Sequence, residues 1–190
     1  MILPIYLYGQ PVLRQVSQPI SRDYPNLGEL IENMKETMYA SDGIGIAAPQ
    51  VGLDIRVIYI DVDVISQSRP ELKDIRMVLI NPELEVDENS KTVTLEEGCL
   101  SLPGIHENVT RHDRIRLHWF DENWNEHTEV IEGYLARVVQ HEYDHLEGHV
   151  FIDHASAIRK QLIRTKLNNI VEGKVSCDYR VRPFRTKKRR

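Results

Sequence analysis

The segment His141-Glu142-Tyr143-Asp144-His145 constrains the fold of this chain more than any other. On an α-helix its two histidines lie one turn apart on the same face, so both can bind one metal ion. Glu142 then stands beside the metal, where a carboxylate can take the proton from a metal-bound water. The segment therefore predicts a helix and indicates a metallohydrolase.

The residues around this segment distinguish a metal site from a chance match. H-E-x-x-H also occurs on the polar face of surface helices, where it binds nothing. Here the neighbours are mostly apolar, which predicts a helix that is largely buried. Imidazoles buried without partners cost stability, and metal binding removes that cost. We therefore favour a metal site. The apolar neighbours are Leu135, Ala136, Val138, Val139 and Leu146.

Cys99 is the candidate for a third ligand, because two histidines leave a tetrahedral site at least one protein ligand short. It is one of only two cysteines and follows the strand-like run 92–95. Gly98 beside it frees the backbone for close approach to a metal or a substrate. A lone cysteine is more often a small buried hydrophobic residue. Because the chain also contains the histidine pair, we favour Cys99 as a metal ligand.

A third segment, residues 43–52, reads GIGIAAPQVG and by itself predicts a close-packed turn, since it lacks the spacing of a phosphate-binding loop. It is followed along the chain by EGCLS at 97–101 and QHEYDH at 140–145. With these three motifs in this order, the chain resembles the peptide deformylases. That family removes the N-formyl group from the initiator methionine of nascent polypeptides and releases formate. The resemblance extends over most of the chain, from Ile5 to the helix after Asp153.

The resemblance implies a role for each residue that matches a motif. Glu142 is then the catalytic base that prepares a metal-bound hydroxide for attack on the formyl carbon. Gln50 and the Leu100 N–H would stabilise the developing oxyanion. The implied metal ligands are Cys99, His141 and His145.

Substrate recognition is expected to use backbone pairing, because an enzyme acting on many nascent chains cannot depend on side chains beyond the first residue. Ile44 and Gly45 suit an extended peptide that adds as a strand. Val138 is expected to line the pocket for the methionine side chain, and Gly98 to border the substrate.

Several other polar residues near the motifs have two interpretations. Tyr134 and Arg137 can line the outer wall of the methionine pocket or pack as ordinary surface residues. Arg111 and Arg114 can anchor a loop or bind a substrate carboxylate, and we favour the anchor. Asp144 is a candidate for orienting a ligand or a neighbouring loop. The histidines expected to lie on the surface are His106, His112, His118, His127 and His154.

The metal itself is not determined by the donors. One thiolate and two imidazoles leave a coordination position for water, which is typical of a catalytic site. They suit Fe²⁺, Zn²⁺, Ni²⁺ or Co²⁺. The family resemblance implies one divalent ion per chain, with Fe²⁺ as the working ion and zinc as a less active occupant.

Apolar spacing predicts two further amphipathic helices, one over residues 27–38 and one from Ser156. Strand-like runs follow one another with links mostly too short for helical crossovers, which favours antiparallel pairing. We therefore predict an α+β fold, a curved and mostly antiparallel sheet packed around the central H-E-x-x-H helix. The strand candidates are residues 56–61, 77–81, 91–96, 115–120 and 126–132. The last helix should pack through Ile158, Leu162, Ile163, Leu167 and Ile170, with Arg159 facing solvent.

The length of 190 residues suits one domain, which we assign to residues 1–172. Residues 173–190 are expected to form a mobile basic tail, because seven of the 24 basic residues lie in the last 11 positions. The net charge is nevertheless −5, so the rest of the chain is acidic. We therefore expect no DNA binding, but the tail can contact ribosomal RNA.

The composition favours a cytoplasmic protein. No stretch approaches the ~20 apolar residues that cross a bilayer, and the N-terminus lacks the features of a secretion signal, so no membrane contact is expected. Two cysteines, Cys99 and Cys177, provide no disulfide framework, and a thiolate ligand is safer in a reducing compartment.

Two other functions use the same motif. A zincin-type metallopeptidase shares H-E-x-x-H but takes a downstream carboxylate or histidine as third ligand, for which Glu172 is the main candidate. A metal-stabilised binding module would close the site with a fourth protein ligand, for which Cys177 is the spare cysteine. Cleavage of an internal peptide bond would indicate the first, and absence of exchangeable water on the metal the second.

Overall fold

The computed structural model describes residues 1–185. The α+β fold is confirmed, because every predicted helix and strand overlaps an observed one. No helix in this part of the chain is long and apolar enough to cross a membrane. The α-helices are α1 (Leu27–Ala40), α2 (Gly133–Leu146) and α3 (Ala157–Val171). The strands are β1 (Ile5–Tyr6), β2 (Gly45–Ala47), β3 (Val57–Asp61), β4 (Arg76–Val86), β5 (Thr92–Gly98), β6 (His106–His112), β7 (Arg114–Phe120), β8 (Glu126–Glu132) and β9 (Val181–Arg182).

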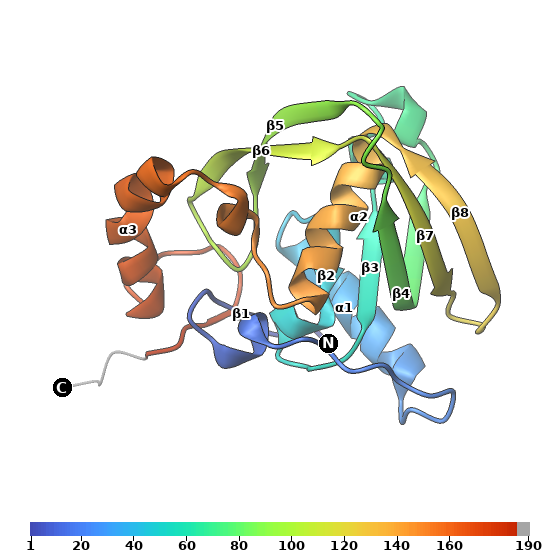
Figure 1. Cartoon of the computed structure of the whole chain (residues 1–190). Helices are drawn as coiled ribbons and strands as arrows, with labels where there is room; N and C mark the ends of the chain where they lie inside the picture. Colours follow the sequence, from blue (N-terminus) through green and yellow to red (C-terminus); the bar gives the residue numbers. More distant parts are fainter. Residues whose placement is uncertain (186–190) are drawn as a thin grey trace.

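Five strands form one antiparallel sheet in the order β2-β3-β4-β7-β8 (Figure 1). The pairing of β4 with β7 shifts register between Ile80 and Glu83. At this point Asn81 has a φ of 49°, and Pro82 has no N–H to donate to the ladder. Irregularities of this kind bend a strand, so the shift contributes to the curvature of the sheet around α2.

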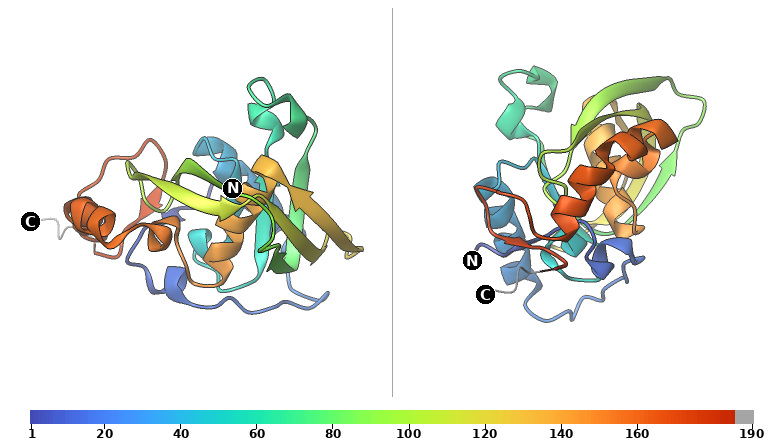
Figure 2. Two further views of the ribbon diagram at one scale, coloured as in Figure 1. Left: turned by 45° about the horizontal axis from the view of Figure 1, so that its top comes forward. Right: turned by 90° about the vertical axis from the view of Figure 1, so that its left-hand side faces the viewer.

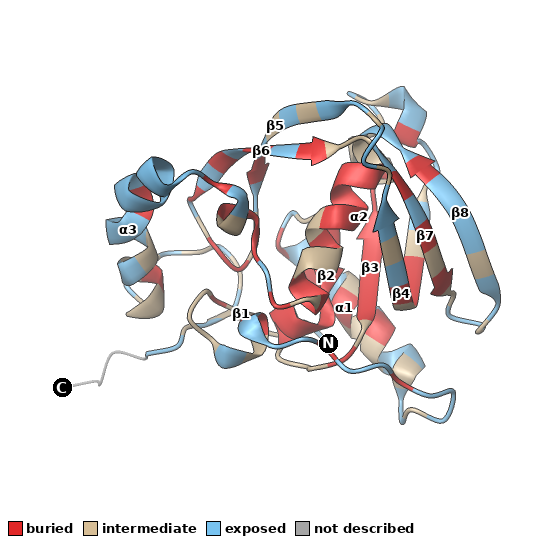
Figure 3. Ribbon diagram, viewed as in Figure 1, coloured by how far each residue is buried: buried red, intermediate tan, exposed pale blue. Residues whose placement is uncertain are grey.

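Helix α2 lies in the middle of the molecule and is mostly buried (Figures 1 and 3). One apolar cluster joins it to the sheet and includes Val139, Ile58 and Leu79. A second cluster gathers α1, α3 and the N-terminal segment, with Met34 and Phe151 among its fully buried members. The motif helix is therefore held in place by packing, as its apolar neighbours predicted.

Strands β5 and β6 form a separate antiparallel hairpin beside the sheet. The first of these strands was predicted to belong to the sheet, and the second was not predicted. The buried positions of β6 are Glu107, Val109 and Arg111, so two of the three are charged. Apolar alternation therefore gave no signal there. The hairpin matters for the site, because β5 ends at Gly98 and the next residue is Cys99.

The packing predicted for α3 was partly wrong. Ile163 is buried, but Ile158 and Leu162 are 75% and 65% exposed. The first turns of α3 are held instead by Arg159, whose Nε lies 2.7 Å from Oε2 of the buried Glu107. These turns lie beyond the apolar core, so the spacing of their apolar residues was no guide to burial.

The chain after α3 turns at Gly173, which has a φ of 65°, and runs back beside the N-terminal segment (Figure 2). Strand β9 pairs in parallel with β1. A mobile tail was predicted from residue 173, whereas residues 173–185 lie against the domain in the structure. The physical reason is that apolar residues, Val175, Tyr179 and Val181, alternate with polar ones, so an extended chain presents them on one inner face that packs against the apolar cluster. The domain boundary at residue 172 stays a prediction, and Lys187–Arg190 lie outside the described residues.

Candidate active site and metal centre

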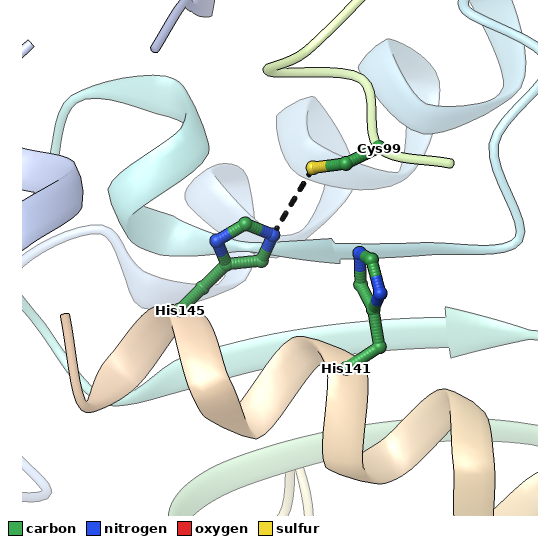
Figure 4. A group of neighbouring side chains, drawn as sticks. All are labelled: Cys99, His141 and His145. Atoms are coloured by element: carbon green, nitrogen blue, oxygen red, sulfur yellow. Dashed lines mark hydrogen bonds between the residues drawn. The ribbon is translucent and has the colours of Figure 1, made fainter. Parts of the chain in front are cut away.

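The ligand atoms of Cys99, His141 and His145 meet in one place (Figure 4). The Cys99 Sγ and one ring nitrogen of each histidine lie within 4.8 Å of one another. The Cys99 Sγ lies 3.3 Å from Nε2 of His145. Figure 4 shows both imidazoles extending from α2 toward the loop that carries Cys99. Three donors at such separations can surround a single ion.

Helix α2 gives two of these donors their direction. His141 and His145 are four residues apart, and their rings meet edge to face with centroids 5.4 Å apart. His145 is fully buried. The ring of Phe151 stacks on His141 with centroids 5.9 Å apart, which restricts the imidazole plane. Packing therefore orients the donors before any metal binds.

Glu97 belongs to the site, although the sequence analysis gave it no role. Its Oε2 accepts a hydrogen bond of 2.9 Å from Nδ1 of His141. Its Oε1 accepts hydrogen bonds from Arg111 at 2.8 Å and Arg137 at 2.6 Å. A carboxylate on the outer nitrogen sets the tautomer of an imidazole and leaves the inner nitrogen for a metal. The signal that could have revealed Glu97 is its place two residues before Cys99 in the EGCLS motif.

The same network extends away from the site through Arg111. This guanidinium also donates a hydrogen bond of 2.9 Å to Asp144, whose carboxylate contacts His154. Arg114, in contrast, pairs with a different carboxylate: its Nε lies 3.3 Å from Oε1 of Glu132 on β8. The anchoring interpretation favoured for Arg111 and the orienting one for Asp144 agree with these contacts.

The network controls the charges at the site. Burial opposes ionisation of Glu97, but hydrogen bonds from His141 and Arg111 outweigh it and hold the pKa of that carboxyl well below its ordinary value. Burial also opposes ionisation of Cys99, yet the neighbouring His145 and His141 lower its pKa to about 5. The site therefore favours a thiolate, which is the form of cysteine that binds metals.

Glu142 lies next to the ligand group without belonging to it. It is 4% exposed, and its Oε2 has no hydrogen-bond partner among the described residues. Burial raises the pKa of Glu142 to about 7, which suits proton exchange near neutral pH. Gly45 on β2 leaves space for this carboxylate, because a Cβ at Gly45 would lie 2.5 Å from Oε1 of Glu142.

Gln50 and Leu100 approach the ligand group from two loops. Gln50 is buried in the 3₁₀ turn Ala48–Val51, where its Oε1 accepts a hydrogen bond of 2.8 Å from the Ala47 N–H. This contact turns Nε2 toward Cys99, whose Sγ lies 3.4 Å away. Leu100 directly follows Cys99 in the chain. Both groups expected to stabilise an oxyanion therefore adjoin the ligands.

A cavity of about 620 Å³ opens beside these residues. It is lined by all three sequence motifs, including Ile44, Gly45 and Gly98, and by Tyr134, Arg137 and Val138 of α2. Two parts of the lining were not expected from the sequence. His106 is exposed, as predicted, but it also lines the cavity, and the last part of the wall comes from Ser176, Cys177, Asp178 and Tyr179 beyond α3.

The donor set fits a divalent transition metal. A favoured thiolate and two imidazoles are suitable ligands, and three protein ligands leave a position open. The buried Oε2 of Glu142 stands beside that set without a partner in the described part of the chain. A site of this composition can bind a metal and activate water next to it.

The geometry disfavours the two other functions. Among the described residues, the group that can hold a metal contains neither Glu172 nor Cys177. Glu172 pairs with Lys174 at the end of α3. Within the described residues, this site therefore lacks the downstream carboxylate ligand of such a metallopeptidase. It also lacks the fourth protein ligand that would close the site of a binding module.

Comparisons with known proteins agree with these observations. The family model described as polypeptide deformylase matches residues 2–161. The peptide deformylase of Christiangramia forsetii is 45% identical over 100% of both chains, and that of Flavobacterium psychrophilum is 47% identical over 96% of this chain and 97% of its own. The crystal structure of peptide deformylase from Thermus thermophilus is similar with a TM-score of 0.77 and 38% identity, covering 89% of this chain and 97% of that one. The Thermotoga maritima structure has a TM-score of 0.73 and 40% identity, covering 82% of this chain and 99% of that one.

Proposed function

The chain belongs to the polypeptide deformylase family of metal-dependent enzymes, and we propose which of its residues remove the formyl group from nascent peptides. Cys99, His141 and His145 hold the metal, and Glu142 is the catalytic base. One observation carries this proposal. Three ligand atoms lie within 4.8 Å of one another beside a buried carboxylate oxygen that has no partner among the described residues.

The working ion in this proposal is Fe²⁺, which rests on the family resemblance. Zn²⁺, Ni²⁺ and Co²⁺ are alternatives that the same donors accept. When bound, a divalent ion polarises the formyl carbonyl and lowers the pKa of a water molecule. Glu97 keeps His141 in the tautomer that can bind it, through the hydrogen bond to Nδ1.

Glu142 moves the protons. It accepts one from the water that attacks the formyl carbon, and it delivers one to the amine nitrogen as the C–N bond breaks. The products are formate and a peptide with a free N-terminus. The pKa of about 7 supports this role, because the group can then both accept and release a proton near neutral pH.

Gln50 and Leu100 stabilise the negative charge that develops on the formyl oxygen. The side-chain Nε2 of Gln50 and the backbone N–H of Leu100 are the donors. Gln50 is preorganised for this role by the contact between its Oε1 and the Ala47 N–H. Leu100 is brought near by its neighbour Cys99.

The substrate backbone pairs with β2. This strand lies at one edge of the sheet, so its outer side is not used by another strand of that sheet. Ile44 and Gly45 line the cavity there and suit an extended peptide as an added strand. Val138 and Gly98 border the methionine side chain from α2 and β5.

The test is an anaerobic preparation with metal analysis, assayed on formyl-Met-Ala and, separately, on an unformylated peptide. We expect about one metal ion per chain and release of formate only. Cleavage of an internal peptide bond would contradict the proposal. The iron-loaded enzyme should lose activity in air faster than the zinc-loaded one, since zinc has no redox chemistry. Equal stability of the two forms would argue against iron.

We also propose a cytoplasmic location and contact between the basic tail and ribosomal RNA. The tail residues Lys187–Arg190 lie outside the described residues, so this proposal rests on charge alone. Removal of the residues after Pro183 should reduce co-sedimentation with ribosomes at low salt and leave turnover of formyl-Met-Ala unchanged. Equal co-sedimentation of both forms would contradict it.

A further inference from the structure

The segment that follows α3 reaches the active site. We call residues 175–182 the return segment. It leaves the turn at Gly173, runs toward the centre of the molecule and ends beside β1 (Figures 1 and 2). Four of its residues, 176–179, line the cavity that contains the candidate metal ligands. The family model ends at residue 161, so this wall lies outside the part of the chain that the model matches.

The return segment is held in place at its far end. The N–H of Ile5 donates to the Arg180 carbonyl at 2.8 Å, and the N–H of Leu7 donates to the Arg182 carbonyl at 3.1 Å. The Gln10 side chain adds hydrogen bonds to the carbonyls of residues 182 and 183. Its inner side chains, Val175, Tyr179 and Val181, pack against the larger of the two apolar clusters. Backbone pairing and packing therefore hold Tyr179 at the site.

Tyr179 contacts the loop that supplies an oxyanion donor. Its hydroxyl donates a hydrogen bond of 2.8 Å to the Leu100 carbonyl. No backbone N–H in the described part of the chain donates to that carbonyl. The next peptide is held from the other end of the chain, because the Tyr8 N–H donates to the Ser101 carbonyl at 2.8 Å. The turn after Cys99 is thus fixed by both terminal segments.

We infer that Tyr179 is a positioning residue for deformylation, which holds the Leu100 backbone so that its N–H faces the reacting carbonyl oxygen. The inference rests on the proposed function of Leu100. Oxyanion donors act because they are aimed before the reaction begins, and a displacement of about 1 Å can cost up to about 100-fold in rate. The Leu100 N–H belongs to the Cys99–Leu100 peptide, whose carbonyl accepts a hydrogen bond of 2.9 Å from the Leu102 N–H. The Tyr179 hydroxyl holds the adjoining Leu100–Ser101 peptide, so its loss frees rotation at Leu100 and lets the donor peptide turn away.

The first test is Tyr179→Phe, which removes one oxygen atom and keeps the ring. We expect kcat on formyl-Met-Ala to fall about tenfold, with KM and metal content little changed, because the donor acts mainly in the transition state. Hydrogen exchange of the Leu100 amide should become faster. Tyr39→Phe is the matched control, since the Tyr39 hydroxyl also donates a hydrogen bond, to the Asp61 carboxylate, but Tyr39 is not among the residues that line the cavity. Its kcat should not change.

The outcomes separate this inference from the proposed function. If the unmodified enzyme fails to release formate, the proposed function is wrong. If it is active and Tyr179→Phe keeps its kcat, or loses activity only in proportion to lost metal, the positioning role is overturned. If that variant does not fold, Gln10→Ala replaces it, because it loosens the anchor of the return segment without touching Tyr179. A folded Gln10→Ala with faster exchange over residues 175–182 and unchanged kcat would also overturn the inference.

Discussion

The two regions that meet at the candidate metal site are held in place in different ways. Helix α2 carries His141, Glu142 and His145, and the helical backbone itself gives their relative positions. The turn after β5 carries Cys99 and Leu100, and its own hydrogen bonding is limited to short turn contacts such as Leu102 N–H to the Cys99 carbonyl, at 2.9 Å. The turn depends on partners from distant parts of the chain.

The two regions are therefore expected to respond differently to substitutions. A substitution of a site residue on α2 should remove a chemical group and leave the helix in place, because packing on the sheet holds the helix. A substitution around the turn also changes geometry, because the contacts of Glu97 and Tyr179 span 44 and 79 residues of sequence. Loss of chemistry and loss of position can therefore be told apart by measuring metal binding, turnover and stability separately.

The largest effect is expected at Cys99, the one proposed ligand that the turn supplies. Cys99→Ala should lose metal affinity and, with it, activity, because the thiolate is one of three donors. Metal content after dialysis and a competition titration measure this. Cys177→Ala is the matched control and should keep its metal, since Cys177 is outside the ligand group. Full occupancy at unchanged affinity in Cys99→Ala would exclude Cys99 as a ligand.

Glu142→Gln tests the contribution of α2, because it should remove the proposed catalytic carboxylate without moving the helix. The amide keeps the shape but cannot accept the proton, so kcat should fall by about 10²–10⁴-fold while metal content stays the same. Glu147→Gln, at the end of the same helix, should retain turnover. Near wild-type turnover in Glu142→Gln would remove this residue from the role of base.

Gly45→Ala tests the space around the same carboxylate. The added Cβ would lie 2.5 Å from Oε1 of Glu142, so the carboxylate or β2 must shift. A shift near 1 Å should reduce kcat by up to about 100-fold, with metal still bound. Gly28→Ala serves as a control, because a Cβ at Gly28 meets no atom within 4 Å. Unchanged kcat in Gly45→Ala would mean that Glu142 tolerates displacement.

Glu97→Gln tests the support of the turn and of His141. Loss of the carboxylate should weaken metal affinity by about 10–100-fold, as for other groups that orient a ligand. It should also lower stability, because Arg111 and Arg137 lose a buried anionic partner. Glu107→Gln is a closely matched control. Glu107 lies opposite Glu97 in the hairpin, is equally buried and bonds Arg159 instead. It should lose stability and keep metal affinity, and equal affinity losses in both variants would contradict the specific role of Glu97.

The sequence predicted the part of the site on α2 more completely than the groups that support the turn after β5. The motif helix and its buried setting were predicted correctly, because a period of 3.6 residues relates the histidines to each other and to the apolar face. The candidate ligands were each named, and the structure brings them together. Glu97 had no assigned role and β6 was missed, since their burial depends on charged partners that only folding brings near.

The amino-acid sequence alone was enough to predict the candidate chemical groups and the fold class of this protein: two histidines and a glutamate on one helix, a cysteine beside a glycine, and an α+β pattern of helices and strands. Local geometry suffices for these, because helix and strand periods are properties of short segments. The residues that orient these groups could be identified only from the folded chain. Tyr179 lies far from Leu100 in sequence and sits in a segment expected to be a mobile tail, yet its hydroxyl reaches the Leu100 carbonyl. Contacts of this kind depend on where packing brings the two ends of the chain, which no local pattern records.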